Sequence, residues 1–164
     1  MDQHSQSHGV WDWTARIHAS QTELKCSYNV IIFTGSPPED PKEWLICPQF
    51  VGKLAVHVPA GRGYGRRMRS DNDIVEGFVH LSQAIAQRSG LASLEPEQVV
   101  PYLKQSLTWR VQELDDTPVE LQSLEVVVFA TPLAVPPGGQ FPVPGESQRY
   151  DDITRGKKGG SRNE

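Results

Sequence analysis

The residues best suited to chemistry lie in one short loop, Gly61–Arg69, with the sequence GRGYGRRMR. Besides its three glycines it contains these residues: Arg62, Tyr64, Arg66, Arg67, Met68 and Arg69. Arginine beside an aromatic ring is typical of single-stranded nucleic-acid contacts, of docking surfaces for acidic proteins and of ordinary solvated loops. No helix start follows the glycines, so they do not form a phosphate-binding loop. Because the net charge is -4, we do not expect nucleic acid as a partner, and the other two interpretations remain open.

Metal binding and catalysis find less support elsewhere in the chain. The five histidines lie in the polar N-terminus or near the ends of predicted strands: His4, His8, His18, His57 and His80. No Cys or carboxylate completes a metal-ligand spacing, so we expect no metal site. Gly35–Ser36 is followed by two prolines, which is not the GxSxG pattern of a hydrolase nucleophile. The residues therefore favour a chain that is not catalytic by itself.

The apolar runs on either side of the loop, Phe50–Val58 and Ile74–Leu81, predict strands. Alternating or β-branched runs predict further strands at Trp11–His18, Cys26–Thr34, Trp109–Leu114 and Leu121–Thr131. A short helical insert is expected near residues 81–107, with Ser93 as a cap and Pro101 kinking or splitting its second part. Thirteen Pro and fourteen Gly among 164 residues favour short strands over long helices. We therefore expect a mainly β protein: an antiparallel β-sandwich or small barrel of about six or seven strands.

The ends of the chain have a different composition from its centre. We expect residues 1–10 to be loose, residues 11–145 to form one β-domain and the charged, Gly-rich residues 146–164 to be a flexible tail. The N-terminus has neither a basic nor an apolar signal region, so we expect a cytoplasmic location and no membrane contact. Cys26 and Cys47 are too few for a disulfide framework and are interpreted as free thiols, although a single bridge remains open.

Several segments together resemble the C-terminal domain of fungal tyrosinases. They are WDWTARI, YNVIIFTG with PPEDPKEW and PQFVG, the run from VEGFVHLSQ to LKQSLTWRVQ, and SLEVVVFATPL. The resemblance extends from about Trp11 to Gly145. It implies a β-rich domain similar to the third domain of arthropod haemocyanins. In that family the domain follows a helical catalytic domain with two histidine-bound copper ions, covers its entrance and keeps the proenzyme latent until proteolysis.

The chain also departs from the family pattern. It contains none of the catalytic helices or copper-binding histidines, so it would be a stand-alone product, a separated fragment or a subunit of a split enzyme. A CxxC pair that is thought to help deliver copper in some members would be expected near Gly63–Arg67, where this chain has GYGRR. A guanidinium cannot replace a soft thiolate ligand. The family also places a blocking side chain over the metals, for which His57 and Tyr64 are the candidates.

Two functional hypotheses follow. The first is a non-catalytic domain that binds, shields or helps assemble a tyrosinase-like catalytic domain with type-3 copper or a related metal. In it, the residues that face the partner are His57, Arg62, Tyr64, Arg66, Arg67, Met68 and Arg69. The alternative is a small-molecule enzyme or binding protein recruited to fungal secondary metabolism. The absence of any pocket above about 300 Å³ would argue against that alternative.

Overall fold

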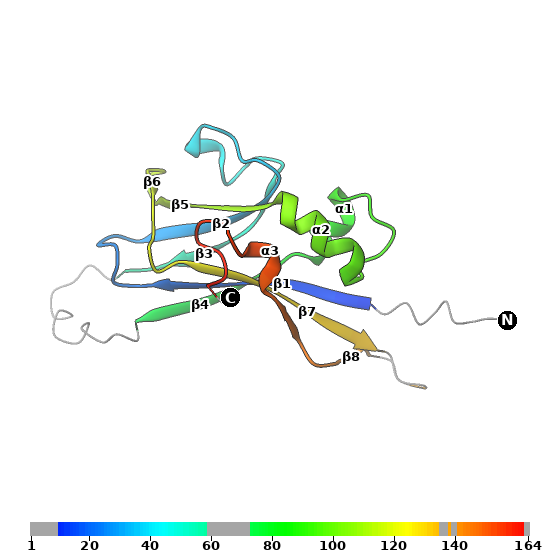
Figure 1. Cartoon of the computed structure of the whole chain (residues 1–164). Helices are drawn as coiled ribbons and strands as arrows, with labels where there is room; N and C mark the ends of the chain where they lie inside the picture. The colour runs from blue at the N-terminus through cyan, green and yellow to red at the C-terminus, as the bar shows by residue number, and fades with distance from the viewer. Residues whose placement is uncertain (1–9, 59–72, 135–137, 139–140, 163–164) are drawn as a thin grey trace.

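Two antiparallel sheets pack face to face in the computed structural model, which describes residues 10–58, 73–134, 138 and 141–162 (Figure 1). Sheet A has the order β4 (Ile74–His80), β1 (Val10–Ser20), β7 (Glu125–Ala134) and β8 (Val143–Pro144), and β9 (Gln148–Tyr150) also pairs with β7. Sheet B has the order β3 (Phe50–Val56), β2 (Tyr28–Thr34), β5 (Leu107–Glu113) and β6 (Pro118–Val119). This arrangement confirms the expected β-sandwich, with nine strands in the described part of the chain where six or seven were expected.

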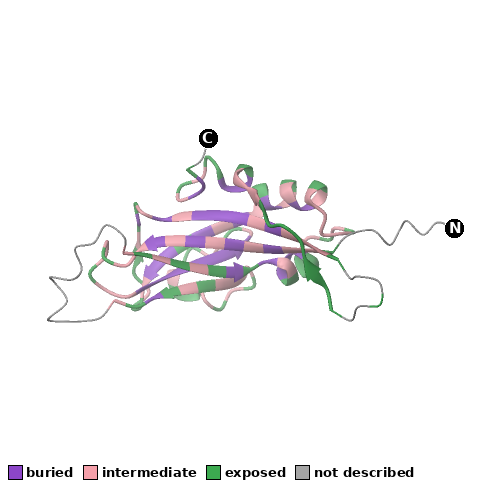
Figure 2. Cartoon of the chain, turned by 90° about the horizontal axis from the view of Figure 1, so that it is seen from below, coloured by how far each residue is buried: buried purple, intermediate pink, exposed green. Residues whose placement is uncertain are grey.

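The main core lies between the two sheets, where Figure 2 shows most of the buried residues. In β1 the predicted alternation holds, and Trp13, Ala15, Ile17 and Ala19 all point into the core. The central strand β2 is buried on both faces. Its outward residues Ile31 and Phe33 pack in a second, smaller cluster with Trp44.

The segment that covers the outer face of β2 is the Pro-rich stretch between β2 and β3. It contains a short 3-10 helix, Pro41–Glu43. Asp40 caps that helix by accepting a hydrogen bond from the Lys42 N–H at 3.0 Å. Cys47 lies beside this cluster, and Cys26 lies just before β2 and not within it as predicted. Both cysteines are free thiols and half-buried.

The helical insert contains α1 (Ser82–Arg88) and α2 (Pro96–Ser106). Of the two expectations for Pro101, that it would split this segment was wrong, because α2 continues through it. Pro101 is exposed, whereas Val99 and Leu103 on either side of it are anchored in the core. The lost hydrogen bond is therefore on the solvent side of a helix fixed by packing. The N-cap is Glu95, not Ser93, and makes no side-chain capping bond.

The segment from residue 146, for which we expected a flexible tail, forms β9 and α3 (Asp151–Thr154). Ile153 is buried in the main core, and the rings of Tyr150 and Trp13 lie 5.4 Å apart. The Val126 N–H donates to the Gly159 carbonyl at 2.8 Å. Apolar contacts and main-chain bonds therefore fix this charged segment against sheet A. No helix in the described residues is long and apolar enough to cross a membrane.

Candidate functional site

The basic loop connects the last residue of β3 to the first residue of β4, and so it links the two sheets. Tyr64, Met68 and the four arginines lie outside the described residues. The structure does describe the two ends of the loop, which are His57 and Val58 after β3 and Asp73 before β4; we call these residues the loop ends. The His57 side chain is exposed at the end of β3.

Two glycines bring the strands that bear the loop ends close together. β3 and β4 contact each other although they belong to different sheets. A Cβ on Gly52 of β3 would lie 2.7 Å from Cγ1 of Val79 on β4. A Cβ on Gly77 of β4 would lie 2.4 Å from Cδ1 of Leu54 on β3. Each glycine thus leaves room for a side chain of the opposite strand, and we call this arrangement the glycine contact.

The turn between β1 and β2 holds both loop ends. Gln21 donates from its side-chain Nε2 to the His57 carbonyl at 2.7 Å, and from its main-chain N–H to the Asp73 carbonyl at 2.8 Å. The Ser27 hydroxyl accepts a hydrogen bond from the Val58 N–H at 2.8 Å. Sequence reasoning placed Ser27 in the predicted strand Cys26–Thr34 and missed the role of both residues, since a lone glutamine gives no signal of a long-range contact.

Glu23 fixes the same turn to the segment before β7. Its carboxylate accepts hydrogen bonds from the main-chain N–H groups of Gln122 and Ser123 at 2.6 and 2.9 Å. Burial by itself would raise the pKa of Glu23. The hydrogen bonds from Ser123 and Gln122, together with the positive charge of Arg162, outweigh this effect and hold the pKa below its usual value. The turn that supports the loop ends is therefore itself rigidly attached to the sandwich.

Beside the loop ends, the outward face of β4 exposes large apolar side chains. Ile74 is 47% exposed and Phe78 is 55% exposed. Phe78 is the cross-strand neighbour of Arg16 on β1. The Arg16 guanidinium lies 5.1 Å from the ring centre of Phe129 on β7, and its buried Nε has no hydrogen-bond partner among the described residues. We call Ile74, Phe78, Arg16 and Phe129 the sheet A patch.

The sheet A patch was not among the predicted site residues, although one signal for it was present. Alternation in Ile74–His80 places Ile74, Glu76, Phe78 and His80 on one face and Val75 and Val79 on the other. The two polar residues Glu76 and His80 mark the first face as the exposed one, so the pattern also places Ile74 and Phe78 on the solvent side. Across the sheet, Glu76 accepts from His18 at a distance of 2.8 Å between Oε2 and Nε2, which ties the polar members of this face together.

The described residues contain no group of three His, Cys, Asp or Glu side chains placed to hold a metal ion. None of the histidines His18, His57 and His80 belongs to such a group among the described residues.

Comparison with known proteins identifies the domain. A family model for the tyrosinase C-terminal domain matches residues 12–128. A tyrosinase of Neurospora crassa is 30% identical over 155 residues, which cover 89% of this chain and 23% of that protein. Polyphenol oxidase 2 of Agaricus bisporus is 30% identical over 156 residues, which cover 92% of this chain and 27% of that protein. The chain thus spans about a quarter of the length of these relatives.

Solved structures agree with the sequence comparison. A structure of recombinant mushroom tyrosinase superposes with a TM-score of 0.67 at 28% identity, covering 88% of this chain and 25% of that one. A structure in which latent and active mushroom tyrosinase coexist gives a TM-score of 0.66 at 30% identity, covering 88% of this chain and 26% of that one. The chain belongs to the tyrosinase C-terminal domain family.

Proposed function

We propose that this chain is a non-catalytic domain that docks on a tyrosinase-like catalytic domain and shields its active-site entrance. The observation that supports this most is the match to only about a quarter of each relative, which leaves the rest of those proteins as the counterpart. One solved relative is described as existing in latent and active forms, and a removable shielding domain would produce two such forms. The partner is then a tyrosinase-like catalytic domain, in the same protein or as a separate subunit.

The sheet A patch is the surface that we assign to this contact. Exposed Phe and Ile side chains on a strand are costly in water and gain free energy when a partner covers them. Arg16 lies beside them, and its Nε is buried within the chain and so out of a partner's reach. A partner with an apolar centre would therefore cover the Phe and Ile side chains.

The loop ends determine where the basic loop starts relative to this contact. The glycine contact and the hydrogen bonds of Gln21 fix where the chain leaves β3 and where it enters β4. A loop with fixed ends beside a docking patch starts at a defined place relative to the partner. We therefore retain Tyr64 and His57 as candidates for the side chain that blocks the entrance. Arg62, Arg66, Arg67, Met68 and Arg69 remain candidates for the surrounding contacts.

The copper of such an enzyme would belong to the partner. The described residues offer no cluster of ligands that fits a copper ion, and the chain has GYGRR where a thiol pair would be expected. The role proposed for this chain is accordingly steric. It excludes water and substrate from the partner's entrance and requires no metal chemistry of its own.

The test is to mix the chain with the tyrosinase-like catalytic domain encoded in the same or a neighbouring gene. We expect a complex by size-exclusion chromatography and a lower rate of phenol oxidation than with the catalytic domain alone. Phe78→Asp should weaken binding about tenfold or more, because it places a charge at the centre of the contact. The matched control is Ile46→Asp, which changes a residue that is 80% exposed and lies beyond the outer face of the other sheet.

Two results would contradict the proposal. One is the absence of any complex at tens of micromolar, a concentration at which ordinary transient interfaces form. The other is a complex that loses affinity equally with both variants, because the effect would then not belong to the sheet A patch. The second hypothesis, a small-molecule binding protein, has support of its own in a pocket on sheet B.

A further inference from the structure

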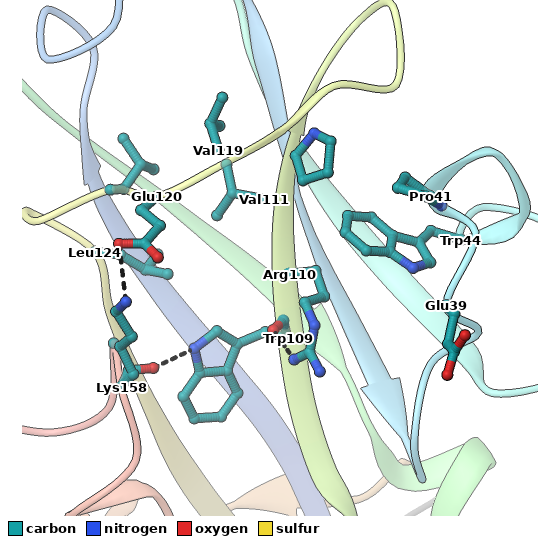
Figure 3. A pocket seen from close by; sticks show the side chains of 13 residues that line it. Glu39, Pro41, Trp44, Trp109, Arg110, Val111, Val119, Glu120, Leu124 and Lys158 are labelled. Atoms are coloured by element: carbon teal, nitrogen blue, oxygen red, sulfur yellow. Dashed lines mark hydrogen bonds and ion pairs between the residues drawn. The ribbon is translucent and has the colours of Figure 1, made fainter.

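A pocket of about 510 Å³ opens at the edge of sheet B, beside β5 (Figure 3). This volume lies within the usual range of small-molecule sites. The strands β5 and β6 belong to the sheet opposite to the sheet A patch, so the pocket is separate from the docking surface. Its walls come from the segment before β3, from β5 and β6, from the segment between β6 and β7, and from the C-terminal segment.

The main chain of Trp109 forms an open part of the β5 edge in this pocket. β6 pairs with β5 only at Val111 and Gln112. The Glu113 N–H donates to the Thr117 carbonyl on the β6 side at 2.8 Å. Because strand main-chain groups alternate in direction, the N–H and C=O of Trp109 point to that same side. Its carbonyl accepts from Nη1 of Arg110 at 2.8 Å, and its N–H has no acceptor among the described residues.

The open edge is too short for another strand. On one side, Nζ of Lys157 donates to the Leu107 carbonyl at 2.9 Å. On the other side, Val111 is already paired with Val119. Only Trp109 remains between these two positions, whereas an added peptide strand needs a row of free main-chain groups. The edge therefore suits a small molecule with one hydrogen-bonding group.

The walls of the pocket are mostly apolar. The indoles of Trp44 and Trp109 lie on opposite sides of Arg110 (Figure 3). Both indole N–H groups are already used inside the protein, by the Pro38 carbonyl at 2.8 Å and the Lys158 carbonyl at 2.9 Å. The rings therefore offer carbon surface to a ligand, as do Val111, Val119, Leu121 and Leu124.

One positive charge in the pocket has no acidic partner. Lys158 and Glu120 pair with each other at 2.8 Å. The Arg110 guanidinium forms no ion pair with a described carboxylate, and its only hydrogen bond to a described residue is the one to the Trp109 carbonyl. Glu39 stands on the opposite wall (Figure 3) and would repel an anion placed on that side. An anionic group is therefore directed to Arg110, where a guanidinium has donors left for a carboxylate.

We propose that this pocket binds a small planar aromatic carboxylate. Its ring lies against the indole and aliphatic walls, and its carboxylate accepts hydrogen bonds from the Arg110 guanidinium and the Trp109 N–H. This inference is independent of the proposed docking function, because neither residue belongs to the sheet A patch. A chain that fails to dock would still bind the ligand.

The test uses 2-naphthoate as the probe and 2-naphthamide as its neutral isostere, with affinities measured by calorimetry on the full chain. We expect 2-naphthoate to bind more tightly than 2-naphthamide. Arg110→Gln should weaken 2-naphthoate about ten- to a hundredfold, since it removes a charge-assisted hydrogen bond, and leave 2-naphthamide nearly unchanged. The control is Lys53→Gln, which also removes one positive charge. Lys53 on β3 and Arg110 on β5 pair with the same residue of β2, Ile31, from opposite sides, so this change should alter neither affinity.

Two further measurements locate the ligand. The NMR signals of the Trp44 and Trp109 indole N–H groups should shift on addition of 2-naphthoate, while those of Trp11 and Trp13 stay in place. Val119→Trp, which fills the pocket, should abolish binding of both probes. No binding at millimolar 2-naphthoate, equal affinity of the two probes, or an unchanged affinity in Arg110→Gln would each overturn the proposal.

Discussion

Gly77→Ala tests whether the glycine contact holds together the two strands that bear the loop ends. The added Cβ would lie 2.4 Å from Cδ1 of Leu54 and 3.1 Å from its Cγ and Cδ2. Real Cβ atoms do not approach carbon so closely, so Leu54 must change its position or β3 must move away from β4. Leu54 is half-buried, and other core residues limit its alternatives.

The magnitude follows from two opposing effects. Overpacking of this kind costs about 1–3 kcal/mol in the free energy of unfolding. Alanine in place of glycine within a strand gives back about 0.5–1 kcal/mol, because the unfolded chain loses less entropy on folding. We therefore expect Gly77→Ala to destabilise the chain by about 0.5–2 kcal/mol, or about 2–6 °C in Tm for a domain of this size.

The assay is a double-mutant cycle by urea unfolding with Leu54→Ala. Leu54→Ala by itself removes apolar contacts, but it also removes the atoms that the new Cβ would meet. The double variant should therefore be more stable than the sum of the two single effects, by about 1 kcal/mol.

The control for this cycle is Gly90→Ala combined with Leu54→Ala. Gly90 has a φ of +73° and open space around its Cβ position, so its substitution costs backbone strain and no clash. These two changes should be additive. If Gly77→Ala and Leu54→Ala were additive as well, the close approach of β3 and β4 would not be the cause, and the reasoning would be refuted.

Three other substitutions test the packing and electrostatics of the chain. Gly160→Ala would place a Cβ 1.9 Å from the Thr154 carbonyl oxygen and should cost about 3 kcal/mol by urea unfolding; a loss below about 1 kcal/mol would contradict the packing of the C-terminal segment. Burial raises the pKa of Tyr28, whose hydroxyl donates to the Ser20 carbonyl at 2.8 Å. The neutral hydroxyl therefore stabilises the fold fully below pH 10, the pKa of tyrosine in the unfolded chain, and this contribution is lost as the pH rises above that value. Tyr28→Phe should accordingly flatten the loss of stability at high pH. An unchanged slope of stability against pH would argue against this explanation. Because the pKa of Glu23 is lowered in the folded chain, its ionised carboxylate stabilises the fold above about pH 4.5, and this contribution is lost at lower pH. The difference in urea midpoint between wild type and Glu23→Gln should therefore shrink on acidification. A difference that stays constant with pH would refute this.

The strands of the sandwich were predictable because their signal is local. In β1, every second residue from Trp13 to Ala19 is apolar and buried, and a period of two needs no knowledge of the rest of the fold. The loop between Phe50–Val58 and Ile74–Leu81 was located in the same way. Pro101 was misjudged because a local rule for helices was applied where anchoring by Val99 and Leu103 on the core prevailed.

The candidate site was predictable only in part. The sequence singles out the basic loop by composition and His57 only through the family resemblance. It does not reveal Gln21, because the contacts of Gln21 with His57 and Asp73 join positions far apart in the chain. The exposure of Phe78 could have been found, since Glu76 and His80 on the same face of β4 mark it as the solvent side, but its position next to Arg16 of β1 depends on the pairing of strands.

The sequence by itself determined the six longest strands, where the basic loop lies between two of them and, through the order of its segments, the family. Only the tertiary structure decided that β3 and β4 meet across two sheets at Gly52 and Gly77, and that the charged C-terminal segment packs against sheet A. It also decided that the edge of β5 stays open at Trp109. The physical reason is that strand order and the position of each edge depend on contacts between distant residues, which the periodicity of a single strand does not encode.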